Sequence, residues 1–163
     1  FISGYTAKVA GTERGIKEPV PSFSACFGAA FLLLDPIVYA KELAEKVEEH
    51  NANAYLVNTG WIGGPHGEGK RIDLPVTRAI IHRILDHTID KMEFVNLPIF
   101  NLNIPKNLDG VDSKVLNPRK LWNNPKRWDK QAKDLAKKFI KNFERFTANE
   151  ETRDLAKAGP HLK

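Results

Sequence analysis

The chain has 163 residues, of which 42% are hydrophobic and 28% charged, and its 25 basic and 20 acidic residues give a formal net charge of +5 at pH 7. These proportions are ordinary for a globular domain with one hydrophobic core, and they exclude a disordered or low-complexity chain. A single cysteine excludes an internal disulfide, and the longest apolar run, residues 29–34, is too short to span a bilayer.

The beginning of the chain predicts two extended segments, residues 1–8 and 22–28, with Pro19 and Pro21 in the loop before the second. Between them, GTERG at residues 11–15 brackets an acid and an arginine with two glycines. An arginine on such a turn commonly binds an anion and just as commonly pairs with a surface carboxylate, so both roles stay open for Arg14.

A helix is predicted next, because Asp35 and Pro36 supply an N-cap acid and a proline at the first helical position. Apolar residues continue at helical spacing, and we expect the helix to end at Asn51. Residues 54–57 then predict a short buried strand. A glycine-rich stretch, residues 58–71, leads into a second helix that is expected to begin near Pro75.

The second half of the chain predicts extended pieces at residues 94–97 and 100–104, and a long helix over residues 125–146. A tail with one more helical turn is expected to follow. The mixture of strands and helices favours an α/β or α+β fold. Many lysines fall between residues 114 and 141, which predicts either a solvated helix face or a surface that binds nucleic acid. The long helix has an apolar side formed by Trp128, Ala132, Leu135, Ala136, Phe139, Ile140 and Phe143.

The glycine-rich stretch contains a G-x-x-x-x-G-K pattern at residues 64–70, as phosphate-binding loops do. Arg71, however, stands where such a loop needs serine or threonine for magnesium, and the next helix begins several residues too late. We therefore interpret this stretch as a glycine loop that delivers Lys70 and Arg71 to a ligand. The planar guanidinium of Arg71 suits a nucleotide, either by stacking on the base or by pairing with phosphates.

Other reactive residue types give weaker indications. No basic residue lies near Cys26 in the sequence, so we expect a small buried hydrophobe rather than a nucleophile. The histidines are scattered, and His82 and His87 are too far apart along their helix to form an i, i+4 pair, so no zinc site is expected. Trp61 is expected to be a core or interface residue, as are the other two tryptophans.

Several motifs, in this order, resemble the ATP-dependent phosphoenolpyruvate carboxykinases over essentially the whole chain. The motifs are FISGYTAKVAGTERG at residues 1–15, FSACFG at 23–28, YLVNTGW at 55–61, GKRI at 69–72, TRAI at 77–80, PIFNL at 98–102 and LNPR at 116–119. The resemblance implies an α/β fold in which residues 1–163 form the C-terminal portion of the carboxykinase nucleotide-binding domain, a mixed sheet with flanking helices. This portion is expected to be incomplete, because the N-terminal domain and the phosphate-binding loop of the family lie upstream.

The resemblance also implies a reaction and a set of site residues. Family members convert oxaloacetate and ATP to phosphoenolpyruvate, ADP and carbon dioxide in gluconeogenesis. Arg14 corresponds to the catalytic arginine that contacts the γ-phosphate and the carboxylate substrate, and Arg71, Ile72 and Thr77 correspond to residues that hold the adenosine end of ATP. The guanidinium groups of Arg14 and Arg71 are thus expected at opposite ends of one nucleotide. The ligands for Mg²⁺ and Mn²⁺ lie upstream in the family, so no metal ligand is expected here.

Taken alone, the chain is expected to be catalytically inactive. The first residue is Phe1 and no signal-peptide pattern follows it, so we expect a fragment of a cytoplasmic protein with no membrane partner. Its expected partners are the small-molecule substrates rather than nucleic acid. The alternative is a free-standing basic module that binds nucleic acid through residues 114–141, or a pure interaction domain.

Overall fold

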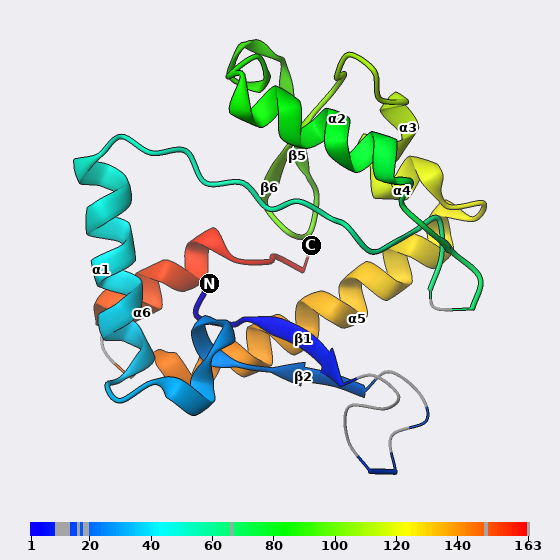
Figure 1. The fold of residues 1–163 in the computed structure, drawn as a ribbon. Coiled ribbons are helices and arrows are strands. Elements are labelled where there is room, and N and C mark those ends of the chain that lie inside the picture. Colours follow the sequence, from blue (N-terminus) through cyan, green and yellow to red (C-terminus); the bar gives the residue numbers. More distant parts are fainter. Residues whose placement is uncertain (9–13, 16, 18–19, 66, 149, 163) are drawn as a thin grey trace. The chain divides into compact units, whose positions relative to one another are not determined.

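The computed structural model describes residues 1–8, 14–15, 17, 20–65, 67–148 and 150–162. The chain divides into two compact units (Figure 1), of which unit 1 comprises Phe1–Ala54 with Lys138–Ala158 and unit 2 comprises Tyr55–Lys137 with Gly159–Lys163. Strands and helices occur in both units, which confirms the α/β expectation. The long helix α5, Pro125–Phe143, contributes residues to both.

In unit 1, β1 (Tyr5–Lys8) pairs antiparallel with β2 (Val20–Phe23). Pro21 was expected in the preceding loop, but it lies within β2 opposite Ala7. The Ser24 amide donates to the Gly4 carbonyl at 2.8 Å, so Gly4 and Ser24 form a hydrogen-bonded pair. Along β1 and β2, non-hydrogen-bonded and hydrogen-bonded pairs then alternate. Pro21 consequently occupies a non-hydrogen-bonded position, where its missing N–H costs the ladder nothing.

The expected strand over residues 22–28 is wrong beyond Phe23. Two short 3₁₀ helices, η1 (Ala25–Phe27) and η2 (Ala29–Phe31), follow β2. Cys26 and Phe27 have φ angles of 51° and 58°, which lie in the left-handed region and cannot continue an extended strand.

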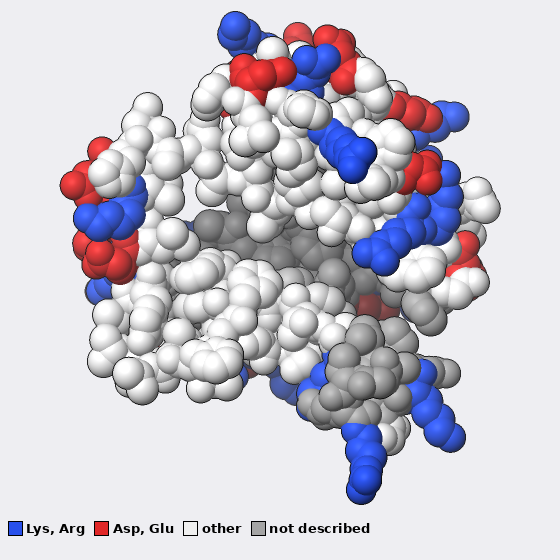
Figure 2. Space-filling model, viewed as in Figure 1, with Lys and Arg blue, Asp and Glu red and all other residues white. Residues whose placement is uncertain are grey.

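Helix α1 spans Pro36–Glu49, and its beginning matches the prediction. The Asp35 carboxylate accepts the Ile37 amide at 2.9 Å, and Pro36 occupies the first turn. The helix ends within two residues of the predicted Asn51, whose φ of 47° is the left-handed conformation common just after a helix. Acidic and basic side chains are intermixed on the face of α1 seen in Figure 2, in keeping with the Lys46–Glu49 ion pair at 2.7 Å.

The packing of unit 1 rests on an aromatic cluster that joins β1 and β2 to α5. Tyr5, Phe23 and Phe139 have ring centroids 5.3–5.7 Å apart. Asn142 also donates to the Ser3 hydroxyl at 2.9 Å. After α5 the chain continues through η4 (Glu144–Phe146), α6 (Glu150–Leu155) and η5 (Ala156–Ala158). The long helix and a helical tail were therefore correctly predicted.

Unit 2 contains two hairpins and several helices. Its elements are β3 (Trp61–Ile62), β4 (Lys70–Arg71), α2 (Leu74–Leu85), η3 (Ile89–Lys91), β5 (Phe94–Leu97), β6 (Leu102–Pro105), α3 (Ser113–Leu116) and α4 (Pro118–Leu121). Its core consists of Leu97, Trp128 and Ala132, with Ile99, Phe100, Ile104 and Trp122 packed around them. The apolar side of α5 predicted from the sequence therefore does supply core residues.

Two expectations about strands are corrected. Residues 54–57 form no strand, because none of the described strands pairs with this run. Leu56, within the run, is 82% exposed. The described strands also form three separate two-stranded antiparallel sheets instead of one mixed sheet. Parallel pairing needs a crossover of about a dozen residues or more. The connection at residues 98–101 is far too short for one, and residues 63–69 are also short of that length.

Candidate functional site

Three of the four predicted site residues lie on one continuous segment of unit 2, at the end of β4 and the start of α2. Arg71 is the exposed last residue of β4. Ile72 is buried, and its amide donates to the Gly60 carbonyl at 2.8 Å. Thr77 is half-buried in the first turn of α2, and its amide donates to the Asp73 carbonyl at 3.1 Å. The structure therefore brings Arg71, Ile72 and Thr77 together by local folding.

Arg71 has a cross-strand neighbour that the sequence did not identify as a site residue. Trp61 lies directly opposite Arg71 in the β3–β4 hairpin. Since the next pair, Gly60 and Ile72, is joined by a hydrogen bond, Trp61 and Arg71 form a non-hydrogen-bonded pair, the type in which side chains approach more closely. Trp61 is 49% exposed, and its side chain projects from the same face of the hairpin as that of Arg71. Only the register of the hairpin reveals this, since nine positions lie between the two residues along the chain.

Asn58 fixes the entry into the hairpin. Its side-chain oxygen accepts the Gly60 amide at 2.8 Å, and its side-chain nitrogen donates to the Trp61 carbonyl at 3.3 Å. Two such hydrogen bonds from one side chain to the nearby backbone stabilise a turn without help from a neighbouring strand. The motif YLVNTGW thus acts here as the turn that positions Trp61.

In the connection between β3 and β4, the backbone at Gly64 and the backbone at Gly69 approach each other so closely that Gly69 leaves no room for a side chain. A Cβ on Gly69 would lie 2.5 Å from the Gly64 carbonyl oxygen and 2.7 Å from that of Ile62. Gly63 and Gly67 have φ angles of 79° and 89°, which favour glycine as well. The segment is a strand–turn–strand hairpin, and α2 begins only after it. This confirms the interpretation that the G-x-x-x-x-G-K pattern is not a phosphate-binding loop, because such a loop runs from a strand directly into a helix.

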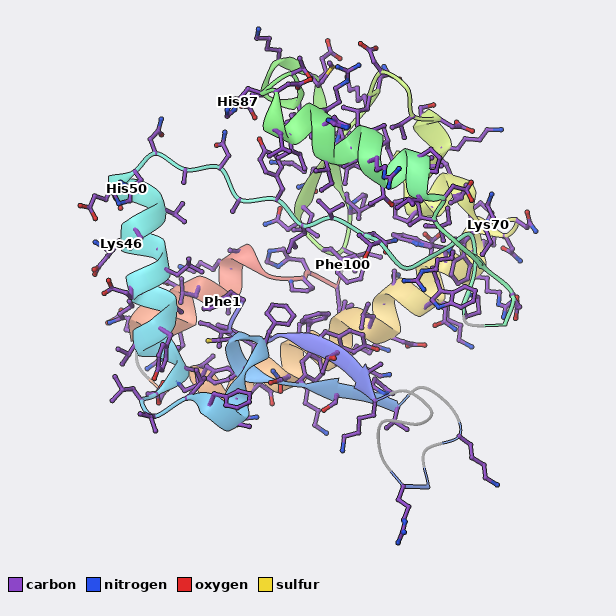
Figure 3. All side chains as sticks on the ribbon, in the orientation of Figure 1. Phe1, Lys46, His50, Lys70, His87 and Phe100 are labelled. Carbon is purple, nitrogen blue, oxygen red and sulfur yellow. The ribbon has the colours of Figure 1, made fainter. Side chains whose placement is uncertain are left out.

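Charged side chains around the hairpin are paired except at Arg71. Glu68 accepts two hydrogen bonds from the Arg127 guanidinium, at 2.5 and 2.7 Å, and these bonds hold the pKa of Glu68 below its usual value. Lys70, labelled in Figure 3, lies 3.6 Å from the Asp73 carboxylate. Among the residues that the structure describes, Arg71 forms no ion pair. Its positive charge is therefore available to a ligand.

Arg14 lies in unit 1, on the turn between β1 and β2. It is exposed, and the following residue, Gly15, has a φ of 88°. Residues 9–13 of the same turn lie outside the described part of the chain. None of the described carboxylates pairs with Arg14, so the structure gives no support to the surface-pairing alternative. Its expected position at the other end of the nucleotide from Arg71 stays a prediction.

The remaining candidates have ordinary environments. Cys26 is half-buried, its thiol lies 3.7 Å from the Pro36 carbonyl oxygen, and burial raises its pKa, as expected for a non-nucleophilic cysteine. His66 lies outside the described residues. The rest of the described chain contains no group of three or more histidine, cysteine, aspartate or glutamate residues arranged to hold a metal ion. No described helix is long and apolar enough to cross a bilayer.

The basic face of α5 is interrupted by acidic side chains. A shallow groove along it is lined by Lys126, Asp129, Lys130, Lys133, Asp134 and Lys137. Asp129 binds the Arg119 guanidinium at 2.7 and 3.0 Å, and Asp134 lies 3.8 Å from Lys137. These contacts favour the interpretation of a solvated helix face over that of a nucleic-acid-binding surface.

Comparison with known families decides what kind of protein carries this hairpin. The family described as phosphoenolpyruvate carboxykinase matches residues 1–114, a range that includes Arg14, Arg71, Ile72 and Thr77. This chain belongs to the phosphoenolpyruvate carboxykinase family. The resemblance noted in the sequence is thereby confirmed.

Curated carboxykinases match almost the full chain. The protein named phosphoenolpyruvate carboxykinase (ATP) from Campylobacter lari is 56% identical over 162 residues, and that from Leptospira biflexa serovar Patoc is 52% identical over 160 residues. The protein of the same name from Caldanaerobacter subterraneus subsp. tengcongensis is 53% identical over 160 residues. The matches cover 98–99% of this chain but only 30–31% of these carboxykinases.

Proposed function

We propose that this chain is the C-terminal portion, residues 1–163, of the nucleotide-binding domain of a cytoplasmic ATP-dependent phosphoenolpyruvate carboxykinase. The whole enzyme converts oxaloacetate and ATP to phosphoenolpyruvate, ADP and carbon dioxide in gluconeogenesis. The observation that carries the proposal is the single β4–α2 segment bearing Arg71, Ile72 and Thr77, in a chain that matches named ATP carboxykinases over nearly its full length.

The adenosine end of ATP is bound by this segment. The Arg71 guanidinium packs on the adenine face, since it is planar, permanently charged and free of a described carboxylate partner. The Ile72 amide is already engaged by the Gly60 carbonyl, so Ile72 contacts the nucleotide through its own carbonyl or side chain. The half-buried Thr77 hydroxyl supplies a donor and an acceptor.

Arg14 acts at the phosphoryl end. Cleavage of the carbon–carbon bond to one carboxylate of oxaloacetate releases carbon dioxide and leaves the enolate of pyruvate. The enolate oxygen then accepts the γ-phosphoryl group of ATP, and ADP is released. Arg14 contacts both the γ-phosphate and the substrate carboxylate, where a fixed positive charge stabilises the charge on the transferring group. Mg²⁺ and Mn²⁺ neutralise phosphate charge in this chemistry, and we place their ligands in the part of the enzyme outside this chain.

The proposal is tested by measuring oxaloacetate- and ATP-dependent formation of phosphoenolpyruvate by the full-length protein and by the 163-residue chain alone. We expect turnover by the full-length protein, none by the isolated chain, and loss of turnover in an R14M variant of the full-length protein. An inactive full-length protein would refute the carboxykinase assignment. Turnover by the isolated chain would refute the proposal that this chain holds only part of the active site.

A further inference from the structure

We propose that Glu68 and Arg127 form a positioning pair that holds the β3–β4 connection in the shape that presents Arg71 to the nucleotide. The inference rests on the proposed function of Arg71. It concerns two residues that the sequence motifs did not single out, and both lie in unit 2.

The geometry of the pair is specific. Arg127 Nη1 donates to Glu68 Oε2 at 2.5 Å and Nη2 donates to Oε1 at 2.7 Å, so both carboxylate oxygens are engaged by one planar guanidinium. This parallel arrangement fixes orientation as well as distance. The side chains are 54% and 48% exposed, and exposed ion pairs contribute little to global stability. The pair therefore acts through the local position of the loop.

Arg127 provides a fixed attachment point. It lies in the first turn of α5, where the Asn124 side chain caps the helix by accepting the amides of Lys126 and Arg127 at 3.1 and 3.2 Å. The next residue, Trp128, is buried in the core with Leu97. The backbone at Arg127 is thus fixed by the Asn124 cap before it and by the buried Trp128 after it.

Glu68 is well placed to transmit this constraint to Arg71. The amides of Glu68 and Gly69 both donate to the Pro65 carbonyl, at 3.1 and 2.9 Å, and β4 begins immediately afterwards at Lys70. Strands β3 and β4 have two residues each, which is too short to hold a hairpin by itself. Anchoring the loop at Glu68 therefore determines where β4, and with it Arg71, lies.

A chemically matched control exists in the same unit. Arg119 Nε and Nη2 donate to the Asp129 carboxylate at 2.7 and 3.0 Å, with side chains 48% and 34% exposed. This pair connects α4 to α5 and contains no residue of the β3–β4 hairpin. Like the Glu68–Arg127 pair, it is a partly exposed arginine–carboxylate pair joined by two hydrogen bonds, but it lies elsewhere in the unit.

The experiment compares E68Q, R127M and the charge-swapped E68R/R127E variant with R119M and D129N in the full-length protein. Loss of one partner of the Glu68–Arg127 pair is expected to raise KM for ATP about fivefold, with kcat within about twofold and KM for oxaloacetate unchanged. The charge swap restores most of the ATP affinity, because the pair is re-formed in the opposite sense. The R119M and D129N variants keep the wild-type KM for ATP.

Hydrogen exchange of the Ile72 amide, which donates to the Gly60 carbonyl across the hairpin, supplies a readout that does not depend on turnover. Faster exchange is expected in E68Q and R127M but not in R119M. Unchanged exchange in E68Q, or equal effects of the two pairs on KM for ATP, would overturn the positioning role while leaving the carboxykinase assignment intact. A wild-type protein without ATP-dependent turnover would instead overturn the proposed function, and the inference with it.

Discussion

Trp61 and Arg71 lie directly opposite one another in the β3–β4 hairpin, as a non-hydrogen-bonded antiparallel pair. Side chains of such a pair project from the same face of the hairpin. With Trp61 half-exposed and no described carboxylate paired with Arg71, this face offers an aromatic and a cationic surface side by side. Both surfaces suit the face of an adenine ring.

Replacement of Trp61 by alanine is therefore expected to weaken ATP binding by the full-length protein. We predict an increase in KM for ATP of about three- to tenfold, the range expected for loss of one aromatic stacking contact. W61F should retain most of the affinity because it keeps a ring. L56A is the matched surface control, since Leu56 is 82% exposed in the segment before the hairpin. Equal KM values for W61A and L56A would contradict this role for Trp61.

Replacement of Gly69 by alanine should disrupt the hairpin. The new Cβ would lie 2.5 Å from the Gly64 carbonyl oxygen, and backbone atoms cannot move aside as a flexible side chain does. We expect a destabilisation of about 1–3 kcal/mol in denaturant unfolding, together with a higher KM for ATP. G60A is the control, because its nearest neighbour is a side-chain atom, Asn58 Oδ1, at 3.5 Å. A G69A variant as stable as G60A would show that the hairpin tolerates a wider turn.

Acidification should release the Glu68–Arg127 pair. The hydrogen bonds from Arg127 lower the pKa of Glu68 below the ordinary value of 4.5. A carboxyl group whose pKa is lower in the folded state contributes its stabilisation above the unfolded-state pKa and loses it as the pH falls through the folded-state pKa. Exchange protection of the Ile72 amide, which is hydrogen-bonded to the Gly60 carbonyl, should thus persist at neutral pH and decrease as the pH falls below 4.5.

The pKa of Glu68 can be measured directly by NMR titration of its side-chain carboxyl carbon. In R127M the pKa of Glu68 should rise toward the ordinary value of 4.5, whereas in R119M it should stay low. In E68Q, the Ile72 amide should show no change in protection over the same acidic range. A pKa of Glu68 that does not respond to R127M would mean that the pair is not formed in solution.

Helix α1 gives a prediction that is independent of the nucleotide site. The Asp35 carboxylate caps the helix by accepting the Ile37 amide at 2.9 Å. D35A should destabilise the protein by about 1 kcal/mol in denaturant unfolding, because the amide loses its partner. D35S should recover most of this loss, since serine is also a good N-cap. Equal stabilities of D35A and D35S would contradict a capping role for this side chain.

The sequence by itself determined the longer helices, α1, α2 and α5, and the segment that carries Arg71, Ile72 and Thr77. Asp35 and Pro36 marked the start of α1, Pro75 marked that of α2, and the apolar spacing around Trp128 identified the core side of α5. Helix signals are readable because caps and i, i+4 contacts join residues that are close along the chain. Arg71, Ile72 and Thr77 came together for the same reason, since they share one short segment.

Only the tertiary structure decided which extended runs became strands and which side chains met across the hairpin. Residues 54–57 have a strand-like composition, yet they remain unpaired among the described strands, because a strand is stabilised by a partner that local sequence does not name. Pro21 joined β2 because its register placed it at a non-hydrogen-bonded position. The Trp61–Arg71 and Glu68–Arg127 contacts likewise depend on backbone register and on the approach of separate elements, which the fold supplies and the order of residues does not.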